Sequence, residues 1–311
     1  MTNQPDISII DLNDLNLPER TGSYILHAEK LTLIETSASP SIPYLLAGLN
    51  DLNIDPADIS YIIVTHIHLD HAGGVGLLLE SCPNAKVIVH PRGKRHLNDP
   101  SKLIQGAKAV YGDQFDQLFD PIVPVPSDHL IAKADLDRLE ISNDRTLTFY
   151  DTPGHAKHHF SIHDSKSNAI FTGDTLGIRY PISMTNGTEL ILPSTSPNQF
   201  DPNAMLASMK RIRELNVDAI YFGHYGKSDY PDHVYHQLSQ WLNRYLRISE
   251  TIIKAHPERS VEDQTEAIAE ALFNRVEVES DISDPTVFDY IRLDLNISAQ
   301  GIVDFITDNR R

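Results

Sequence analysis

Four residues with metal-binding side chains lie within six positions of one another, and this cluster limits the possible folds more than any other feature of the chain. The stretch reads VTHIHLDHAGG and contains His66, His68, Asp70 and His71, directly after the apolar run at 61–64. In an extended segment the imidazoles of a His-x-His pair project to the same side, and the residues that follow can face a second position as the chain turns. Imidazole and carboxylate are the usual non-thiolate ligands of zinc and its transition-metal neighbours. The spacing therefore indicates a metal site rather than four unrelated polar residues on a surface loop.

Three further strand-like runs end in the same way, with a turn that contains glycine and then a histidine or an aspartate. These turns read DTPGH, TGD and FGH, and they supply His155, Asp174 and His224. Because side chains at the ends of several strands can converge at one edge of a sheet, the turns together predict one site. Two other histidines, His158 and His159, follow the first of these turns closely. The full set of candidate ligands is His66, His68, Asp70, His71, His155, Asp174 and His224.

Strand patterns alternate with helix patterns as far as about residue 228, and only helix patterns follow. We expect strands at 23–27, 31–35, 61–64, 86–90, 139–141, 147–150, 160–163, 169–171 and 219–222. We expect helices at 41–52, 73–80, within 99–120, and at 201–215, 233–255, 261–275 and 298–307, the last with Ser298 as its cap. The segment 176–199 contains Gly, Pro, Ser and Thr with little periodicity, so it is predicted to be a long loop.

The charge of the chain limits the kinds of partner. Its formal net charge is -17, so the average surface would repel the phosphates of nucleic acid and has little attraction for anionic membranes. No apolar run approaches the roughly 20 residues that span a bilayer, and the opening MTNQPDISII lacks the pattern of a secretory signal. The single cysteine, Cys82, cannot form an internal disulfide. These features predict a cytoplasmic protein that acts on a small molecule.

The motifs resemble those of the metallo-β-lactamase-fold hydrolases over roughly residues 20–226. THIHLDHAGG matches the HxHxDH signature of that superfamily, and DTPGHAKHHFS, FTGD and FGHYG match its later motifs in the same order. The chain looks closest to the glyoxalase II-like and lactonase-like branch. The resemblance implies an α/β fold, a four-layer αβ/βα sandwich with the metals at one edge between two sheets. It implies a catalytic domain at 1–228 and a helical extension packed on it at 229–311.

The same resemblance implies a role for each ligand. His66, His68 and His155 would hold a first metal, and Asp70, His71 and His224 would hold a second. Asp174 would bridge the two ions, and Asp70 would also have a catalytic role. The implied cofactors are two divalent metal ions per chain, with zinc expected and iron or manganese able to accept the same ligands.

Such a site predicts metal-assisted hydrolysis. Two divalent cations can share a hydroxide, because they lower the pKa of water from about 15.7 toward roughly 7. They can also stabilise the charge that develops on a carbonyl or phosphoryl oxygen. The chain has no G-x-S-x-G elbow for a serine nucleophile, and Cys82 is expected to be a buried filler. We therefore expect a dinuclear hydrolase of a small ester, lactone or thioester.

Several alternatives stay open or are disfavoured by single features. The flavodiiron reductases of the superfamily have Glu where this chain has His68, which disfavours that group. The negative net charge of this chain disfavours an RNA-processing role like that of ribonuclease Z. A sulfur dioxygenase with a single iron, a phosphodiesterase of the same fold and a non-catalytic ligand-binding regulator remain. The complete ligand set disfavours the regulator.

Substrate contacts are expected outside the ligand set. The candidates are Arg179, Tyr180, Met184 and Tyr225. Some lactonases of this fold use a tyrosine three residues after the bridging aspartate, and Gly177 stands there in this chain. No basic cluster suggests a glutathione site. The helices after residue 229 either cover the pocket or form a homodimer contact, with Trp241, Leu242, Tyr245 and Leu246 at helical spacing.

Overall fold

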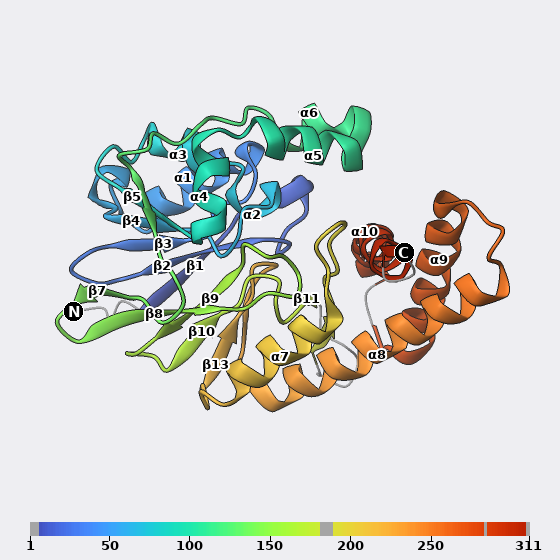
Figure 1. Ribbon diagram of the computed structural model, residues 1–311. Coiled ribbons are helices and arrows are strands. Elements are labelled where there is room, and N and C mark those ends of the chain that lie inside the picture. The colour runs from blue at the N-terminus through green and yellow to red at the C-terminus, as the bar shows by residue number, and fades with distance from the viewer. Residues whose placement is uncertain (1–5, 181–188, 283–284, 309–311) are drawn as a thin grey trace. The chain divides into compact units, whose positions relative to one another are not determined.

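The computed structural model describes residues 6–180, 189–282 and 285–308 of the chain (Figure 1). Contacts divide the chain into two compact units. The first unit is Met1–Asp151, His158–Gly173 and Val217–Asp229, and the second is Thr152–Lys157, Asp174–Asn216 and Tyr230–Arg311. The helices after residue 229 therefore share a unit with residues 174–216, and a domain boundary at residue 228 stays a prediction.

The first unit contains a six-stranded sheet in the order β1 to β6 (Figure 1). Its strands are β1 (Ile7–Asp11), β2 (Gly22–Leu26), β3 (Thr32–Ile34), β4 (Tyr61–Ile63), β5 (Lys86–Val89) and β6 (Leu130–Ala132). The first three strands pair antiparallel, whereas β3 to β6 pair parallel. Parallel strands end at the same edge of the sheet, so the loops that follow β3, β4 and β5 begin close together.

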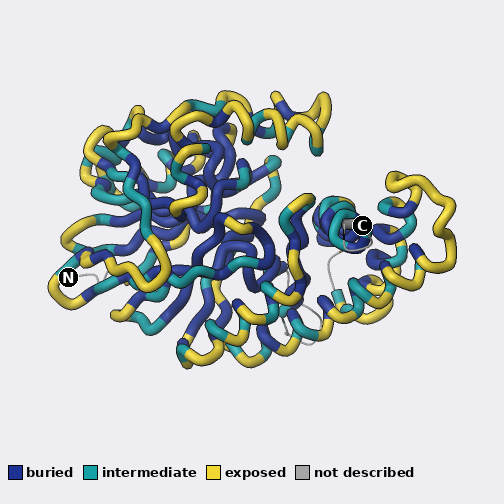
Figure 2. The backbone as a smooth tube through the Cα atoms, in the orientation of Figure 1, coloured by how far each residue is buried: buried dark blue, intermediate teal, exposed yellow. Residues whose placement is uncertain are grey.

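Strands β2 to β5 are largely buried on both faces of the sheet (Figure 2), which explains their nearly continuous apolar runs. In β4, Ile62 packs in the cluster shared with helices α1 (Ile42–Asp51) and α3 (Val75–Leu79), and its neighbour Ile63 packs against the second sheet. Leu33 and Ile34 alternate in the same way in β3. Each buried side chain of this kind contributes about 1.5–3 kcal/mol of hydrophobic stabilisation.

Further helices follow the parallel strands in the first unit. They are α2 (Leu69–Ala72), α4 (Pro91–Asn98), α5 (Ser101–Tyr111) and α6 (Phe115–Phe119). Gly74 lies between α2 and α3, where a Cβ atom would come within 2.6 Å of Ile42 and 3.1 Å of the Ser37 carbonyl oxygen. Glycine is therefore required there for close packing.

The second sheet of this unit has the order β14-β13-β10-β9-β8-β7. Its strands are β7 (Arg138–Ser142), β8 (Arg145–Asp151), β9 (Phe160–Asp164), β10 (Ala169–Phe171), β13 (Ala219–Tyr221) and β14 (Lys227–Ser228). Strands β10 and β13 pair parallel, so the turns that contain Gly173 and Gly223 leave the sheet at the same edge. The nitrogen of Gly223 donates to the carbonyl oxygen of Gly173 at 3.4 Å. These turns lead directly into Asp174 and His224.

A buried ion pair ties two strands of the second sheet together. Arg145 donates from Nε to Oδ1 of Asp164 at 2.9 Å and from Nη2 to Oδ2 at 2.7 Å, and neither side chain is exposed. A third donor, Nη1, reaches the carbonyl oxygen of Asp6 at 2.9 Å. Such a pair is tolerated in the interior because its hydrogen-bonding groups are satisfied.

The described residues of the second unit form two paired strands and four helices. They are β11 (Ile178–Tyr180), β12 (Leu190–Leu192), α7 (Pro202–Arg213), α8 (Pro231–Ala255), α9 (Val261–Glu279) and α10 (Val287–Asp308). Asp201 caps α7, since its carboxylate accepts from the nitrogens of Asn203 and Ala204. No described helix is long and apolar enough to cross a membrane.

Two predictions for this unit were wrong. The expected long loop at 176–199 contains the β11–β12 hairpin, whose three-residue strands are too short to stand out among the surrounding polar residues. Ser298 does not begin a helix, because α10 starts at Val287 and buries a continuous face that includes Ile291 and Leu295. Polar residues on its other face masked this periodicity in the sequence.

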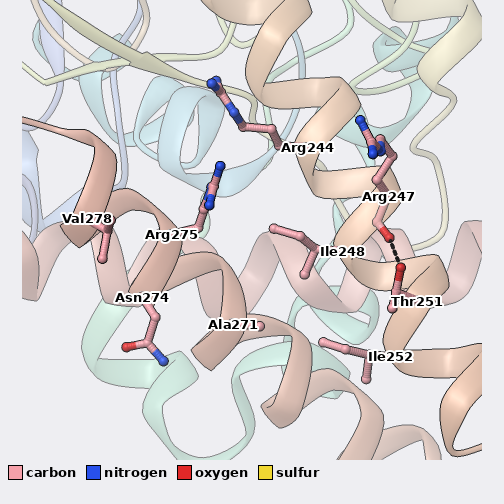
Figure 3. Close-up of a pocket in the computed structure, with 9 residues that line it drawn as sticks. All are labelled: Arg244, Arg247, Ile248, Thr251, Ile252, Ala271, Asn274, Arg275 and Val278. Atoms are coloured by element: carbon pink, nitrogen blue, oxygen red, sulfur yellow. Dashed lines mark hydrogen bonds between the residues drawn. The ribbon is translucent and has the colours of Figure 1, made fainter.

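A groove of about 640 Å³ lies between α8 and α9 (Figure 3). Ile248 and Ile252 contribute apolar surface, and Arg244 and Arg275 both pair with Glu279. None of the candidate ligands, and none of the candidate substrate contacts that the structure describes, lines it. The groove is therefore separate from the chemistry that the motifs predict.

Candidate metal centre

The metal-binding motif lies at the carboxyl edge of the parallel strands. Strand β4 ends at Ile63, and His66 and His68 follow in the loop that leads to α2. Asp70 and His71 lie on α2 itself, which begins immediately after His68. A buried strand followed by a one-turn helix thus brings all four side chains of the motif to one end of the first unit.

His66 and His68 present ring nitrogens to each other. Nε2 of His66 is 3.1 Å from Nδ1 of His68, and the two rings are nearly perpendicular. The other nitrogen of His66 lies 3.1 Å from the hydroxyl of Thr65. His66 is fully buried, so its position is fixed by packing as well as by hydrogen bonding.

A second group of three ligands lies in the same unit. Asp70, His71 and His224 offer ligand atoms that all lie within 4.8 Å of one another. Oδ2 of Asp70 is 3.7 Å from Nε2 of His71 and 3.7 Å from Nε2 of His224. The two histidines are buried, whereas 29% of the Asp70 side chain is exposed. Solvent therefore reaches this group at Asp70.

Glu35 lies behind this group and was not predicted from the sequence. Its Oε2 accepts a hydrogen bond from Nδ1 of His71 at 2.7 Å, and its Oε1 accepts from the nitrogen of Thr65 at 2.7 Å. Glu35 is 1% exposed and has a φ of 69°, a left-handed conformation that costs about 1–2 kcal/mol for a non-glycine residue. A carboxylate at the end of the strand next to the motif was the available signal.

His158 and His159 lie close to His66. The ring of His159 stacks on His66 with centroids 4.9 Å apart, and the ring of His158 is parallel to it at 6.2 Å. A Cβ atom on Gly173 would come within 2.7 Å of Nε2 of His159, so glycine makes room for that ring. Neither histidine belongs to a group of three ligands among the described residues. Their observed contacts are those of packing partners of His66.

Asp14 is a further buried carboxyl group whose field reaches the second group of ligands. Burial raises its pKa, the nearby Arg20 opposes this rise, and the charge of Asp70 adds to it. Nε of Arg20 is 3.4 Å from Oδ2 of Asp14. Arg20 thus balances the charge of Asp14, and we do not count Asp14 as a candidate ligand.

The second unit contains the other two candidate ligands. Nε2 of His155 is 3.6 Å from Oδ2 of Asp174, and both side chains are nearly buried. Ser194 contacts both residues. Its carbonyl oxygen accepts from Nδ1 of His155 at 3.0 Å, and its hydroxyl donates to Oδ2 of Asp174 at 2.8 Å.

The spacing of these atoms fits metal coordination. Two nitrogens bound to one tetrahedral zinc at about 2.0–2.1 Å lie roughly 3.3 Å apart. The described pairs of ligand atoms are separated by 3.1 Å to 3.7 Å. In addition, Glu35 accepts a hydrogen bond from Nδ1 of His71, and the Ser194 carbonyl accepts one from Nδ1 of His155. The proton is thereby held on Nδ1, so Nε2 of each histidine carries the lone pair that a metal needs. Asp70, His71 and His224 therefore fit a divalent ion within the first unit, and His155 and Asp174 of the second unit have the spacing of two ligands of one ion.

The sequence profile of the Metallo-beta-lactamase superfamily matches residues 19–224, which include all seven candidate ligands. The chain belongs to this superfamily. The fold class predicted from the motifs is thereby confirmed, with two β-sheets, accompanying helices and a C-terminal helical region. The family assignment also makes the protein a metal-dependent hydrolase.

One relative matches the chain in both sequence and structure. The metallo-beta-lactamase fold-containing protein ST1585 of Sulfurisphaera tokodaii is 30% identical over 221 residues, which are 70% of this chain and 77% of that protein. Its crystal structure superposes with a TM-score of 0.68 at 22% identity and covers 96% of this chain and 98% of that one. The shared fold therefore includes the C-terminal helices.

Two other relatives of this chain have names that state an activity or a cofactor. The N-acyl homoserine lactonase AttM of Azorhizobium caulinodans is 29% identical over 181 residues, 58% of this chain and 63% of that protein. Diflavin flavoprotein A 1 of Synechocystis is 27% identical over 244 residues, 75% of this chain but only 37% of that protein.

The four candidate substrate residues of this hydrolase have different surroundings. Nε of Arg179 pairs with Glu189 at 2.8 Å, and the hydroxyl of Tyr180 donates to Oδ2 of Asp294 at 2.7 Å. Tyr225 has a φ of 55° in the turn after His224. Met184 lies outside the described residues. The roles of these residues in substrate binding stay predictions.

Proposed function

We propose that this protein is a dinuclear metallohydrolase that acts on a small ester, lactone or thioester. The group formed by Asp70, His71 and His224 is the observation that carries the proposal, because it can hold an ion without help from the HxH pair. A chain with only one metal would have little use for this second buried group. In the proposed centre His66, His68 and His155 would hold one ion, the group around Asp70 would hold the other, and Asp174 would be a ligand of both.

Several residues of the chain would each have a separate role in hydrolysis. When bound, the ions lower the pKa of water and polarise the oxygen of the substrate that becomes negatively charged. Glu35 keeps Nε2 of His71 available, as Ser194 does for His155. Asp70 is the member of its group that solvent reaches, so its carboxylate can accept a hydrogen bond from the attacking water. This is the catalytic role proposed for Asp70.

The choice of an ester-like substrate is supported by the similarity to a lactonase. Some lactonases of this fold orient the substrate with a tyrosine, however, and this chain has glycine at the matching position. Gly177 has a φ of 85°, and a Cβ atom there would lie 2.2 Å from the carbonyl oxygen of Leu192. A lactone would have to be oriented by another group, for which Tyr180 and Tyr225 are the proposed candidates.

A mononuclear iron sulfur dioxygenase is the main alternative, because it would use a subset of the same ligands. A phosphodiesterase of the same fold and a non-catalytic regulator are further alternatives. We also propose that the protein is cytoplasmic, acts without nucleic acid or membrane partners, and either is monomeric or dimerises through its helices. The charge of -17 supports the proposed absence of nucleic acid and anionic membrane partners.

Metal content per chain, measured by elemental analysis on protein purified without added metal or chelator, tests the proposal. About two ions per chain, together with turnover of lactones, thioesters or esters, is the expected result. One iron per chain and no other metal would replace the hydrolase by the dioxygenase. In that case oxygen uptake with a persulfide substrate would be the decisive assay.

A further inference from the structure

We propose that helix α10 is a positioning element for the metal ligands of the second unit, and that it acts through residues 194–196. The proposal rests on the proposed function, since it takes His155 and Asp174 as ligands. It gives the C-terminal helices a role in metal binding that does not require them to touch the metal or the substrate.

The first step is the contact between residues 194–196 and the two ligands. Ser194 bonds to both side chains, as described above. The hydroxyl of Ser196 donates to the carbonyl oxygen of His155 at 2.5 Å. Ser194 and Ser196 are 9% and 5% exposed, so water competes little for these hydrogen bonds. A shift of this segment would therefore move both ligands.

The second step is the contact between this segment and α10. The hydroxyl of Thr195 donates to the carbonyl oxygen of Ser298 at 2.7 Å, and Thr195 is 1% exposed. A Cβ atom on Gly301 would lie 2.5 Å from the carbonyl oxygen of Thr195 and 2.7 Å from that of Ser196. The backbone of α10 thus lies directly against the segment, and only glycine permits this distance.

Other contacts extend this interface along one face of α10. Asp294 accepts from Tyr180, and the rings of Phe200 and Phe305 meet edge to face at 5.7 Å. Residues 294, 298, 301 and 305 are spaced by three or four positions, so they lie on the same side of the helix. This face therefore contacts the chain between Asp174 and α7 at three places.

The helix is also held by contacts that do not involve the ligands. Its Phe288 ring meets that of Phe273 in α9 at 5.7 Å, and Ile291, Leu295 and Ile302 are buried. Because these contacts anchor α10 independently, a side chain added at residue 301 should displace residues 194–196 rather than unfold the helix.

The test compares Gly301→Val with Gly106→Val. Gly106 lies in helix α5, and a Cβ atom there would meet nothing within 4 Å, so this control has the same change in helix propensity without the collision. We expect Gly301→Val to lower the affinity for Zn²⁺ about 10-fold or more, measured by competition with a chromophoric chelator. The absorption spectrum of the Co²⁺-substituted protein should change with it. Gly106→Val should match the wild type in both measurements.

A second pair of variants separates positioning from general stability. Thr195→Val removes the hydroxyl that reaches Ser298, and Thr195→Ser keeps it, so the first should weaken Zn²⁺ binding several-fold and the second should not. If Gly301→Val does not fold, this pair decides the matter alone. Wild-type affinity and spectrum in Gly301→Val and Thr195→Val would overturn the role of α10 and leave the hydrolase proposal intact. A wild-type protein that binds no Zn²⁺ would overturn both.

Discussion

Oε2 of Glu35 lies 2.7 Å from Nδ1 of His71, and both side chains are buried. A carboxylate only accepts hydrogen bonds, so the proton of the imidazole is held on Nδ1 and the lone pair is directed from Nε2. This pair connects strand β3 to α2 and couples the conformation of Glu35 to the ligand geometry of His71.

Glu35→Gln should weaken metal binding without unfolding the protein. The amide oxygen can still accept from the nitrogen of Thr65, but the amide NH2 group would then face Nδ1 of His71 and favour the wrong imidazole tautomer. The loss should be about 10-fold to 100-fold in affinity for Zn²⁺. Competition titrations measure the affinity, and circular dichroism measures the fold.

His90→Gln is the matched control for this change. His90 also pairs with a carboxylate, since its Nε2 lies 2.5 Å from Oδ1 of Asp151, but it is outside the ligand set. Its substitution should leave metal content unchanged. Equal losses in the two variants would mean that the effect of Glu35 is general destabilisation.

Asp174→Ala should lower the number of bound metals per chain and abolish hydrolysis. In the proposed centre this carboxylate would be a ligand of both ions, so its loss would affect each of them. Elemental analysis and turnover on the same preparation check the prediction. Full metal loading with unchanged turnover would refute the ligand assignment.

Gly223→Ala should displace His71. A Cβ atom on Gly223 would lie 2.5 Å from Cε1 and 3.0 Å from Nδ1 of that ring. We expect the metal-free protein to lose about 1–3 kcal/mol of stability from overpacking, with an additional loss of Zn²⁺ affinity. Urea unfolding with and without metal separates the two effects. A variant that keeps the wild-type increase in stability on metal addition would contradict the prediction.

Arg145→Met should destabilise the first unit strongly. It leaves the Asp164 carboxylate buried without its cation, and breaking such a pair costs about 3–5 kcal/mol. Urea denaturation gives the change in the free energy of unfolding. Lys254→Ala, which removes the exposed pair with Glu250, should cost less than about 1 kcal/mol. Similar losses in both variants would contradict the argument from burial.

Cys82 should be unreactive in the native protein. Burial raises the pKa of its thiol to about 12 from 9.0, so at pH 8 almost none of the reactive thiolate is present. A thiol reagent should label one cysteine per chain only after denaturation. Because the folded pKa is the higher one, this group's contribution to stability is complete below about pH 9 and is lost as the pH rises toward 12. Rapid labelling of the native protein would show that the site opens.

The candidate ligands could be named from the sequence because each comes soon after a short apolar strand, either in a turn with a recognisable pattern or, for Asp70 and His71, on the short helix α2. His224 illustrates this, since the strand before it and the glycine between them are both visible in the sequence. Glu35 could not be assigned in the same way. A single glutamate at the end of a strand becomes informative only when the parallel pairing of β3 with β4 places it beside the motif.

The contacts of the second unit were harder to foresee for a different reason. Ser194 is 20 positions from Asp174 and 39 positions from His155, and no local pattern marks a serine as a partner of both. The Thr195 contact with Ser298 spans 103 positions. Pairings of this kind depend on tertiary packing, which propensity and periodicity do not encode.

The position of Gly301 also sets an order of events during synthesis. The last candidate ligand is His224, and Gly301 follows it by 77 residues. At about 5–20 residues per second, translation needs roughly 4–15 s to cover that distance. A nascent chain therefore displays every ligand well before α10 exists to hold Ser194 and Thr195 in place. Metal captured during this interval would bind a chain in which residues 194–196 do not yet have their contacts with α10.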